Sequence, residues 1–263
     1  MNADIEAVGR LLASTGPVVY VTGAGISVAS GIAPYRKSAD AVWENFILDW
    51  GTAEKFLADP LQWYRSFWLK AHPSLRAGSA AIKPNAGHDA LTRLLAKHAQ
   101  HRIITQNIDG LHRRSGSPVE RVIEIHGRGD QFVCSNFSHC DASRTAVAPF
   151  DLARIDDGDV PGCEVCGAAL RPLVLLFDET YDAQPAYRAR EARRWLSAAE
   201  AVVFVGTSFS VGITAMAVSA ARFSQARLIN INIDAVEDQS LGFINLVGPA
   251  ELILPALADA AGA

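Results

Sequence analysis

Residues 17–32 read Pro-Val-Val-Tyr-Val-Thr-Gly-Ala-Gly-Ile-Ser-Val-Ala-Ser-Gly-Ile, a short apolar run followed directly by a glycine-rich turn. β-Branched residues without polar alternation are typical of a strand that is buried on both faces of a parallel sheet. Glycines after such a strand let the backbone approach a pyrophosphate at the N-terminus of the next helix. The stretch therefore predicts the first strand, the turn and the helix start of an α/β domain.

The turn lacks the complete fingerprint of dinucleotide-binding dehydrogenases. That fingerprint needs a third glycine at position 28, where this chain has Val28, and the next glycine is Gly31. No acidic residue about twenty positions later ends a second strand. The turn thus argues against hydride transfer, and a tight turn without a ligand remains an alternative.

Further short apolar runs and helical patterns alternate along the chain. We predict strands at residues 17–22, 102–105, 122–125, 173–177, 201–205 and 227–233, and helices at 87–98, 184–199 and 213–224. This alternation favours an α/β fold with a doubly wound parallel sheet.

Two segments interrupt the alternation. Residues 37–81 are rich in aromatic side chains and helical in pattern, and residues 131–169 contain the cysteines together with Asp, Gly and Pro. We predict that both segments are insertions, which together form a small second domain. Residues 1–36, 82–130 and 170–263 then form the large domain.

Composition excludes several classes of protein. The formal net charge of −4 provides no overall field for holding nucleic acid or an anionic membrane. The N-terminus carries acids where a secretory signal needs positive charge. Residues 201–221 lack charge, but hydroxyl side chains and glycines divide them into a strand, a turn and a helix start. We therefore expect a cytoplasmic protein with neither membrane nor nucleic-acid partners.

All four cysteines lie within residues 134–166. Cys163 and Cys166 have the spacing of a zinc knuckle, and Cys134 and Cys140 supply a second pair. Four thiolates form a closed site, so we predict one structural zinc ion per chain without a catalytic role. His139 in place of Cys140, or four free buried cysteines, are the alternatives.

Polar residues follow the second and third predicted strands. Residues 105–112 read Thr-Gln-Asn-Ile-Asp-Gly-Leu-His, and the third strand leads into His126 and Gly127. Ligands of open α/β sheets bind at the carboxyl ends of the strands. His126 is therefore a candidate general base, and a histidine that is hydrogen-bonded for structural reasons is the alternative.

Several motifs occur together in the order of one enzyme family. They are Gly-Ala-Gly-Ile-Ser at 23–27 with Ser-Gly-Ile at 30–32, residues 105–112, His-Gly at 126–127, the paired cysteines and Gly-Thr-Ser at 206–208. Between about residues 18 and 257 the chain resembles the sirtuins, NAD-dependent protein-lysine deacylases, and in particular bacterial-type, single-module members. Cys134 also lies eight residues after His126, the spacing that this family shows.

The resemblance implies a Rossmann-like large domain and a small domain in which residues 37–81 form a helical module and residues 131–169 a zinc ribbon. It also implies a reaction and a set of binding residues. NAD and an acyl-lysine protein or peptide are expected to meet in a cleft between the two domains and to give free lysine, nicotinamide and O-acyl-ADP-ribose. His126 and Asn107 are implied as catalytic, His126 as the base that removes a proton from a ribose hydroxyl. The residues implied in cofactor binding are Gly23, Ala24, Gly25, Ser27, Arg36, Gln106, Asn107, Asp109, Gly206, Thr207, Ser208 and Asn230. Those implied in substrate binding are Tyr35, Tyr64, Phe67, Phe177 and Val211.

Three departures from the family pattern modify these expectations. Ala33 and Tyr35 alter the usual Pro-x-Phe-Arg, which we expect to favour NAD hydrolysis without acyl transfer. Asp178 replaces the glycine of Phe-Gly-Glu and is expected to alter peptide docking or to favour basic sequences. Phe67 takes the place of the arginine that accompanies Tyr64 in sirtuins that remove acidic acyl groups. We therefore predict a neutral acyl group, acetyl or similar.

Two other functions remain open from the residues. An ADP-ribosyltransferase or NAD hydrolase would use the same cofactor with a different acceptor. A binding module would hold NAD without turnover or rely on the zinc ribbon alone. The presence of His126 together with the zinc cysteines argues against the first. The presence of Asn107, Asp109 and His126 argues against the second.

Overall fold

The computed structural model describes residues 2–32, 41–73, 82–147, 149–209 and 212–263. Its larger sheet has six parallel strands in the order β3-β2-β1-β6-β7-β8. The strands are β1 (Val18–Thr22), β2 (His101–Thr105), β3 (Val122–Glu124), β6 (Ala201–Val205), β7 (Arg227–Asn232) and β8 (Ile244–Val247). The strand order reverses between β1 and β6, which is the doubly wound arrangement predicted from the sequence.

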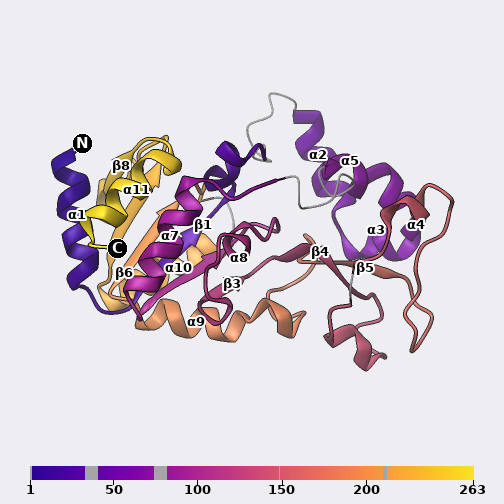
Figure 1. Cartoon of the computed structure of the whole chain (residues 1–263). Coiled ribbons are helices and arrows are strands. Elements are labelled where there is room, and N and C mark those ends of the chain that lie inside the picture. The colour runs from indigo at the N-terminus through magenta and orange to yellow at the C-terminus, as the bar shows by residue number, and fades with distance from the viewer. Residues whose placement is uncertain (1, 33–40, 74–81, 148, 210–211) are drawn as a thin grey trace.

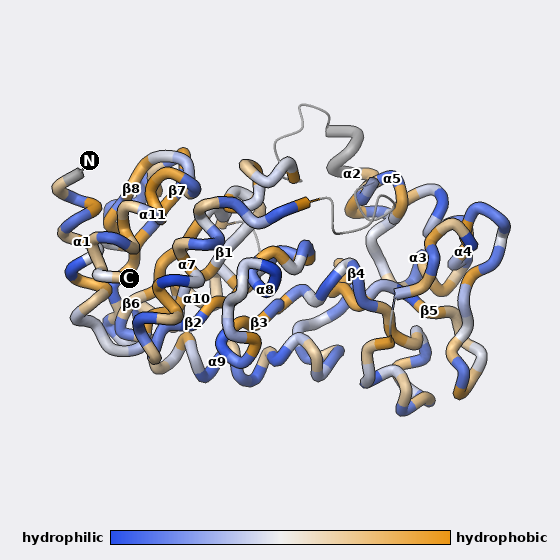
Figure 2. The backbone as a smooth tube through the Cα atoms, viewed as in Figure 1, coloured by the Kyte–Doolittle hydropathy of each residue, from blue (hydrophilic) through white to orange (hydrophobic). Residues whose placement is uncertain are grey.

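Helices cover both faces of this sheet (Figure 1). The helices α1 (Asn2–Ser14), α7 (Ala86–Lys97) and α11 (Ala250–Ala260) pack on one face, and α9 (Ala189–Ala198) and α10 (Gly212–Ser224) pack on the other. Along β1, Val18 and Tyr20 belong to the first core and Val19 and Val21 to the second, so every residue of this strand is buried. Figure 2 shows hydrophobic residues along the strands and a mixture of hydrophilic and hydrophobic residues along α9.

A second, two-stranded sheet lies beyond β3 and carries the cysteine cluster. Its antiparallel strands are β4 (Gly127–Cys134) and β5 (Leu170–Val174). The helical segments beside it are α2 (Ala41–Trp50), α3 (Ala53–Ala58), α4 (Pro60–Trp63), the π-helical turn η2 (Tyr64–Trp68) and α5 (Leu69–Ala71). Aromatic side chains from these helices, among them Trp63 and Phe67, form one apolar cluster with Phe132 of β4 and Val174 of β5.

Short helical turns complete the description. They are η1 (Ala24–Ser30), α8 (Leu111–Arg114), η4 (Val119–Arg121), η5 (Asp141–Arg144), η6 (Leu152–Ile155), η7 (Pro185–Tyr187) and η8 (Gln239–Leu241). Within the described part of the chain, none of the helices combines the length and the apolar character needed to cross a bilayer. Residues 201–221 contain β6, a turn and most of α10, as predicted.

The structure corrects one predicted strand and adds two. Residues 173–177 were expected in the parallel sheet, and this prediction is wrong. The strand there is β5, which ends at Val174 and pairs antiparallel with β4. An apolar run shows that a strand is buried but does not identify its partner strand. Strands β4 and β8 were not predicted, because polar residues interrupt their apolar pattern.

Candidate active site

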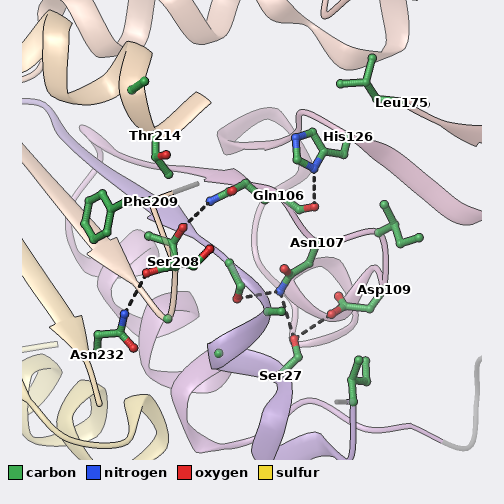
Figure 3. Close-up of a pocket in the computed structure, with 18 of the residues that line it drawn as sticks. Ser27, Gln106, Asn107, Asp109, His126, Leu175, Ser208, Phe209, Thr214 and Asn232 are labelled. Carbon is green, nitrogen blue, oxygen red and sulfur yellow. Dashed lines mark hydrogen bonds between the residues drawn. The ribbon is translucent and has the colours of Figure 1, made fainter. Parts of the chain in front are cut away.

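The carboxyl ends of β1, β2, β6 and β7 open onto a cavity of about 1860 Å³. Residues of α2, η2 and the loop after β5 also line the cavity. Figure 3 shows Leu175 of that loop. Pockets for one small molecule usually enclose roughly 300–1,000 Å³. This cavity therefore has room for a dinucleotide and a second substrate together.

The glycines after β1 serve close packing between two turns. A side-chain carbon added to Gly25 would lie 2.6 Å from Cα of Gly206, and Gly206 itself has a positive φ of 58°. The N–H groups of Gly23 and Gly25 donate to the carbonyls of Val205 and Gly206, both at 2.9 Å. These two N–H groups thus form hydrogen bonds within the protein. The glycines allow the turns after β1 and β6 to pack together beneath the cavity.

Three polar side chains form a connected group on the cavity floor (Figure 3). Ser27 Oγ donates to Asp109 Oδ2 at 2.7 Å, and Asn107 Nδ2 donates to Ser27 Oγ at 3.1 Å. The Leu111 N–H donates to the other oxygen of Asp109 at 2.9 Å. Burial raises the pKa of Asp109, while the bonds from Leu111 and Ser27 oppose that shift. The group holds a carboxylate and an amide in fixed positions at the end of β2.

His126 lies just beyond the end of β3 and faces the same cavity (Figure 3). Its Nδ1 is 2.8 Å from the carbonyl oxygen of Gln106. Because a carbonyl only accepts, Nδ1 carries the proton, and Nε2 of the neutral ring keeps its lone pair. Burial lowers the pKa of His126 to about 4, and the bond to Gln106 raises it. The imidazole is therefore neutral at physiological pH and can accept a proton at Nε2.

Two asparagines on β7 occupy different positions relative to the cavity. Asn232 lines it, and its Nδ2 donates to the carbonyl of Thr207 at 2.8 Å (Figure 3). Asn230 is 1 % exposed and bonds to Asn245 on β8 and to the carbonyl of Asp234. Asn230, the residue implied by the resemblance, is thus not among the described residues that line the cavity. The sequence signal for Asn232 was its place at the carboxyl end of the strand.

Most of the other residues predicted for the site line the cavity. They are Gly23, Ala24, Gly25, Ser27, Phe67, Gln106, Asn107, Asp109, His126, Phe177, Gly206, Thr207 and Ser208. Tyr64 does not, because it is fully buried and its hydroxyl donates to the carbonyl of Leu170 at 2.8 Å. Tyr35, Arg36, Val211 and Ala33 lie outside the described residues.

The loop after β5 is anchored by successive acidic side chains. Asp178 accepts from the N–H groups of Ala53 and Glu54 at 2.8 and 3.1 Å, at the start of α3. Glu179 pairs at 2.8 Å with Arg171, whose side chain is 2 % exposed. The carboxylate of Asp178 is therefore used to join the loop to α3, and its predicted influence on peptide choice stays a prediction.

The four cysteine sulfurs lie within 4.8 Å of one another. Cys134 and Cys166 Sγ are 3.5 Å apart, and Cys140 and Cys163 Sγ are 3.9 Å apart. Four Zn–S bonds of about 2.3 Å in tetrahedral geometry place sulfurs about 3.8 Å apart, so the cluster fits zinc. His139 is exposed and is not part of the cluster, so the all-cysteine set is the one that the structure brings together.

Comparisons with known proteins point to one family. The protein-family model described as "Sir2 family" matches residues 23–212 of this chain. The chain is 33 % identical over 265 residues to the NAD-dependent deacetylase sir2E of Dictyostelium discoideum, covering 97 % of this chain and 76 % of that protein. It is 35 % identical over 226 residues to an NAD-dependent protein deacylase of Aeropyrum pernix, covering 85 % and 83 % of the two chains.

Solved structures give the same result. One described as Sir2 with a p53 peptide and NAD+ has a TM-score of 0.74 and 27 % identity, and the match covers 96 % of each chain. Another, a Sir2 variant with a deacetylated p53 peptide and 3′-O-acetyl ADP ribose, has a TM-score of 0.78 and 26 % identity, and covers 98 % of each chain.

Proposed function

This chain belongs to the Sir2 family, and from that premise we propose that it removes a neutral acyl group, acetyl or similar, from lysine side chains of proteins. It is an NAD-dependent protein deacylase that releases nicotinamide and O-acyl-ADP-ribose. The observation that carries the residue assignment is the meeting of a neutral His126 with the group Ser27, Asn107 and Asp109 in one cavity.

The residues around the cavity floor fit NAD. The turns after β1 and β6, which Gly25 and Gly206 allow to pack closely, both line the cavity, so a phosphate chain can lie against their backbone. Thr207 and Ser208 follow Gly206 after β6 and line the cavity, and Asn232 donates to the carbonyl of Thr207. Asp109 and Asn107 offer an acceptor and an amide for the nicotinamide end. When bound, NAD supplies a sugar carbon that becomes electrophilic as nicotinamide leaves.

His126 is proposed as the general base. Its Nδ1–H is held by Gln106, which orients the Nε2 lone pair for a proton from a ribose hydroxyl. A neutral ring suits this role, because a protonated one has no lone pair to offer. Phe67 and other apolar side chains line the cavity and reduce the contact of water with the region where the acyl oxygen must arrive.

The preference for a neutral acyl group rests on two side chains. Phe67 contributes a hydrophobic ring to the cavity, at the position where family members that remove acidic groups carry a cation. Tyr64 lies in the apolar cluster with its hydroxyl bonded to Leu170. A succinyl carboxylate would therefore meet an apolar surface there, which is unfavourable without a paired charge.

We propose the division into two domains predicted from the sequence, except that residues 127–130 and 170–174, which form the β4–β5 sheet, belong with the ribbon. In its support, the helical module and the ribbon share one apolar cluster, which is separate from the two clusters of the large sheet. We also propose a cytoplasmic location, because a thiolate zinc site suits a reducing compartment.

The test is nicotinamide release from NAD with acetyl-lysine peptide, with products identified by mass spectrometry. We expect release to require the acylated peptide and to fall roughly 10²- to 10⁴-fold in His126→Ala, the usual contribution of a general base. Succinyl peptide should react far more slowly than acetyl peptide. Turnover that needs no peptide and survives His126→Ala, with free ADP-ribose or ADP-ribosylated protein as product, would overturn the proposal.

A further inference from the structure

A tyrosine from the loop after β5 contacts the imidazole of His126. The ring of Tyr181 lies parallel to that of His126, with an angle of 7° between the planes and 5.9 Å between the centroids. The Tyr181 hydroxyl is 3.5 Å from Nε2 of His126. Tyr181 also lines the cavity, so the contact is made where a substrate must arrive.

The direction of this hydrogen bond follows from the neighbouring groups. The Ile213 N–H, at the start of α10, donates to the Tyr181 oxygen at 3.0 Å, and the phenol keeps its own proton to donate. Nε2 of His126 carries the lone pair, because Nδ1 donates to Gln106. Tyr181 is therefore the donor and His126 the acceptor.

The loop around Tyr181 is anchored on both sides. Glu179 pairs with the buried Arg171 at 2.8 Å, and Asp182 forms a two-pronged ion pair with Arg193 at 2.6 and 2.9 Å. The hydroxyl itself is held by Ile213. A side chain whose backbone and tip are both fixed can orient a neighbour, since it loses little freedom when the contact forms.

We propose that Tyr181 is a positioning residue for the deacylation: its hydroxyl donates to Nε2 of His126 and keeps the imidazole facing the cavity until a ribose hydroxyl takes that place. The proposal rests on the function proposed above. It assigns to the loop after β5 a part in orienting the base, in addition to its expected contact with the peptide.

The charged groups near His126 each have another partner. Glu124 pairs with Arg113, Asp109 accepts from Ser27, Glu179 pairs with Arg171, and Asp182 pairs with Arg193. Burial and the Gln106 carbonyl act on the pKa of His126 in opposite directions. A donor at Nε2 stabilises the neutral ring, so loss of the Tyr181 hydroxyl should raise the pKa of His126.

Tyr181→Phe tests the proposal, since it removes the hydroxyl and keeps the ring. In the ligand-free protein, NMR titration of the histidine rings should show a higher pKa for His126 than in the wild type. With NAD and acetyl-lysine peptide, kcat should fall roughly three- to tenfold, because one hydrogen bond fewer holds the imidazole in the orientation that meets the ribose hydroxyl. KM for both substrates should change less than about twofold, because the hydroxyl acts on the base and not on binding.

Tyr20→Phe is the matched control. The Tyr20 hydroxyl bonds to Nδ1 of His101 at 3.0 Å, in the core on the other face of the sheet. This variant should shift the titration of His101 and leave that of His126 unchanged.

An unchanged titration of His126 together with an unchanged kcat in Tyr181→Phe would overturn the proposal, as would a rise in peptide KM alone. If the wild type released no nicotinamide while the His126 titration still shifted in Tyr181→Phe, the contact would hold and the proposed function would fail.

Discussion

Asn230 and Asn232 are two residues apart on β7, so their side chains leave the strand on the same face. Asn230 bonds across to Asn245 of β8, its register partner, and is enclosed by the loop that carries Asp234. Asn232, one pleat further, ends the strand and holds the Thr207 carbonyl. The same type of side chain therefore stabilises the fold at position 230 and lines the cavity at position 232.

Alanine at each position should separate these two effects. Asn232→Ala should weaken binding of NAD or ADP-ribose roughly three- to tenfold, because the turn after β6 loses one hydrogen bond. Asn230→Ala should lower the free energy of unfolding by about 1–3 kcal/mol, because buried partners lose their donor. Calorimetric titration and urea unfolding measure the two quantities. Weaker nucleotide binding in Asn230→Ala at unchanged stability would restore the predicted contact of Asn230 with adenosine.

At the scale of elements, the β4–β5 hairpin depends on its cysteines. The hairpin pairs few residues, and a two-stranded sheet alone is at best marginally stable in water. Cys134 ends β4, and the other three cysteines lie in the segment that connects the two strands. One metal ion there would close the connection, and Phe132 and Val174 pack the two strands against the helices.

Loss of the metal should therefore disturb the ribbon more than the large sheet. We expect one zinc per chain by elemental analysis, and less in Cys163→Ser, with a lower unfolding midpoint. Structural zinc sites of this kind contribute roughly 10–16 kcal/mol in isolated peptides, so the change should be large. His139→Ala is the control and should retain the zinc. Loss of zinc from the control would reinstate His139 as the fourth ligand.

At the scale of the whole molecule, the fold encloses several histidines without charge. Burial lowers the pKa values of His72, His88, His101 and His126 to about 4, and that of His112 well below its usual value. Below about pH 6.5 the unfolded chain binds protons that these folded rings exclude. Stability therefore falls as the pH is lowered from about 6.5 towards 4.

Glu124, which is also buried, acts in the opposite sense. Burial raises the pKa of Glu124 to about 7, so its protonation favours the folded state as the pH falls below 7. With five histidines opposing it, we expect a net loss of stability in urea unfolding at pH 5 relative to pH 7.5. Each histidine contributes at most about 1.4 kcal/mol per pH unit. His101→Gln should reduce the slope, and a stability independent of pH over this range would contradict the prediction.

Much of the fold was predictable because it depends on residue type alone. A run of β-branched residues such as β1 must be buried on both sides, and glycines after it mark a turn without space for side chains. Four cysteines clustered in the sequence indicate a thiolate metal site even when the course of the chain between them is unknown. The catalytic candidate His126 followed from its place after a predicted strand and from the resemblance.

The sequence by itself thus determined the doubly wound sheet, the glycine turn and the presence of a cysteine cluster, because composition and local spacing suffice for each. Only the tertiary structure decided that β5 pairs with β4, that Asn232 instead of Asn230 reaches the cavity, and that Tyr181 meets His126. The physical reason is that each of these contacts joins segments far apart in the chain. Their geometry depends on how whole elements pack against one another, and a local pattern of residues does not predict that packing.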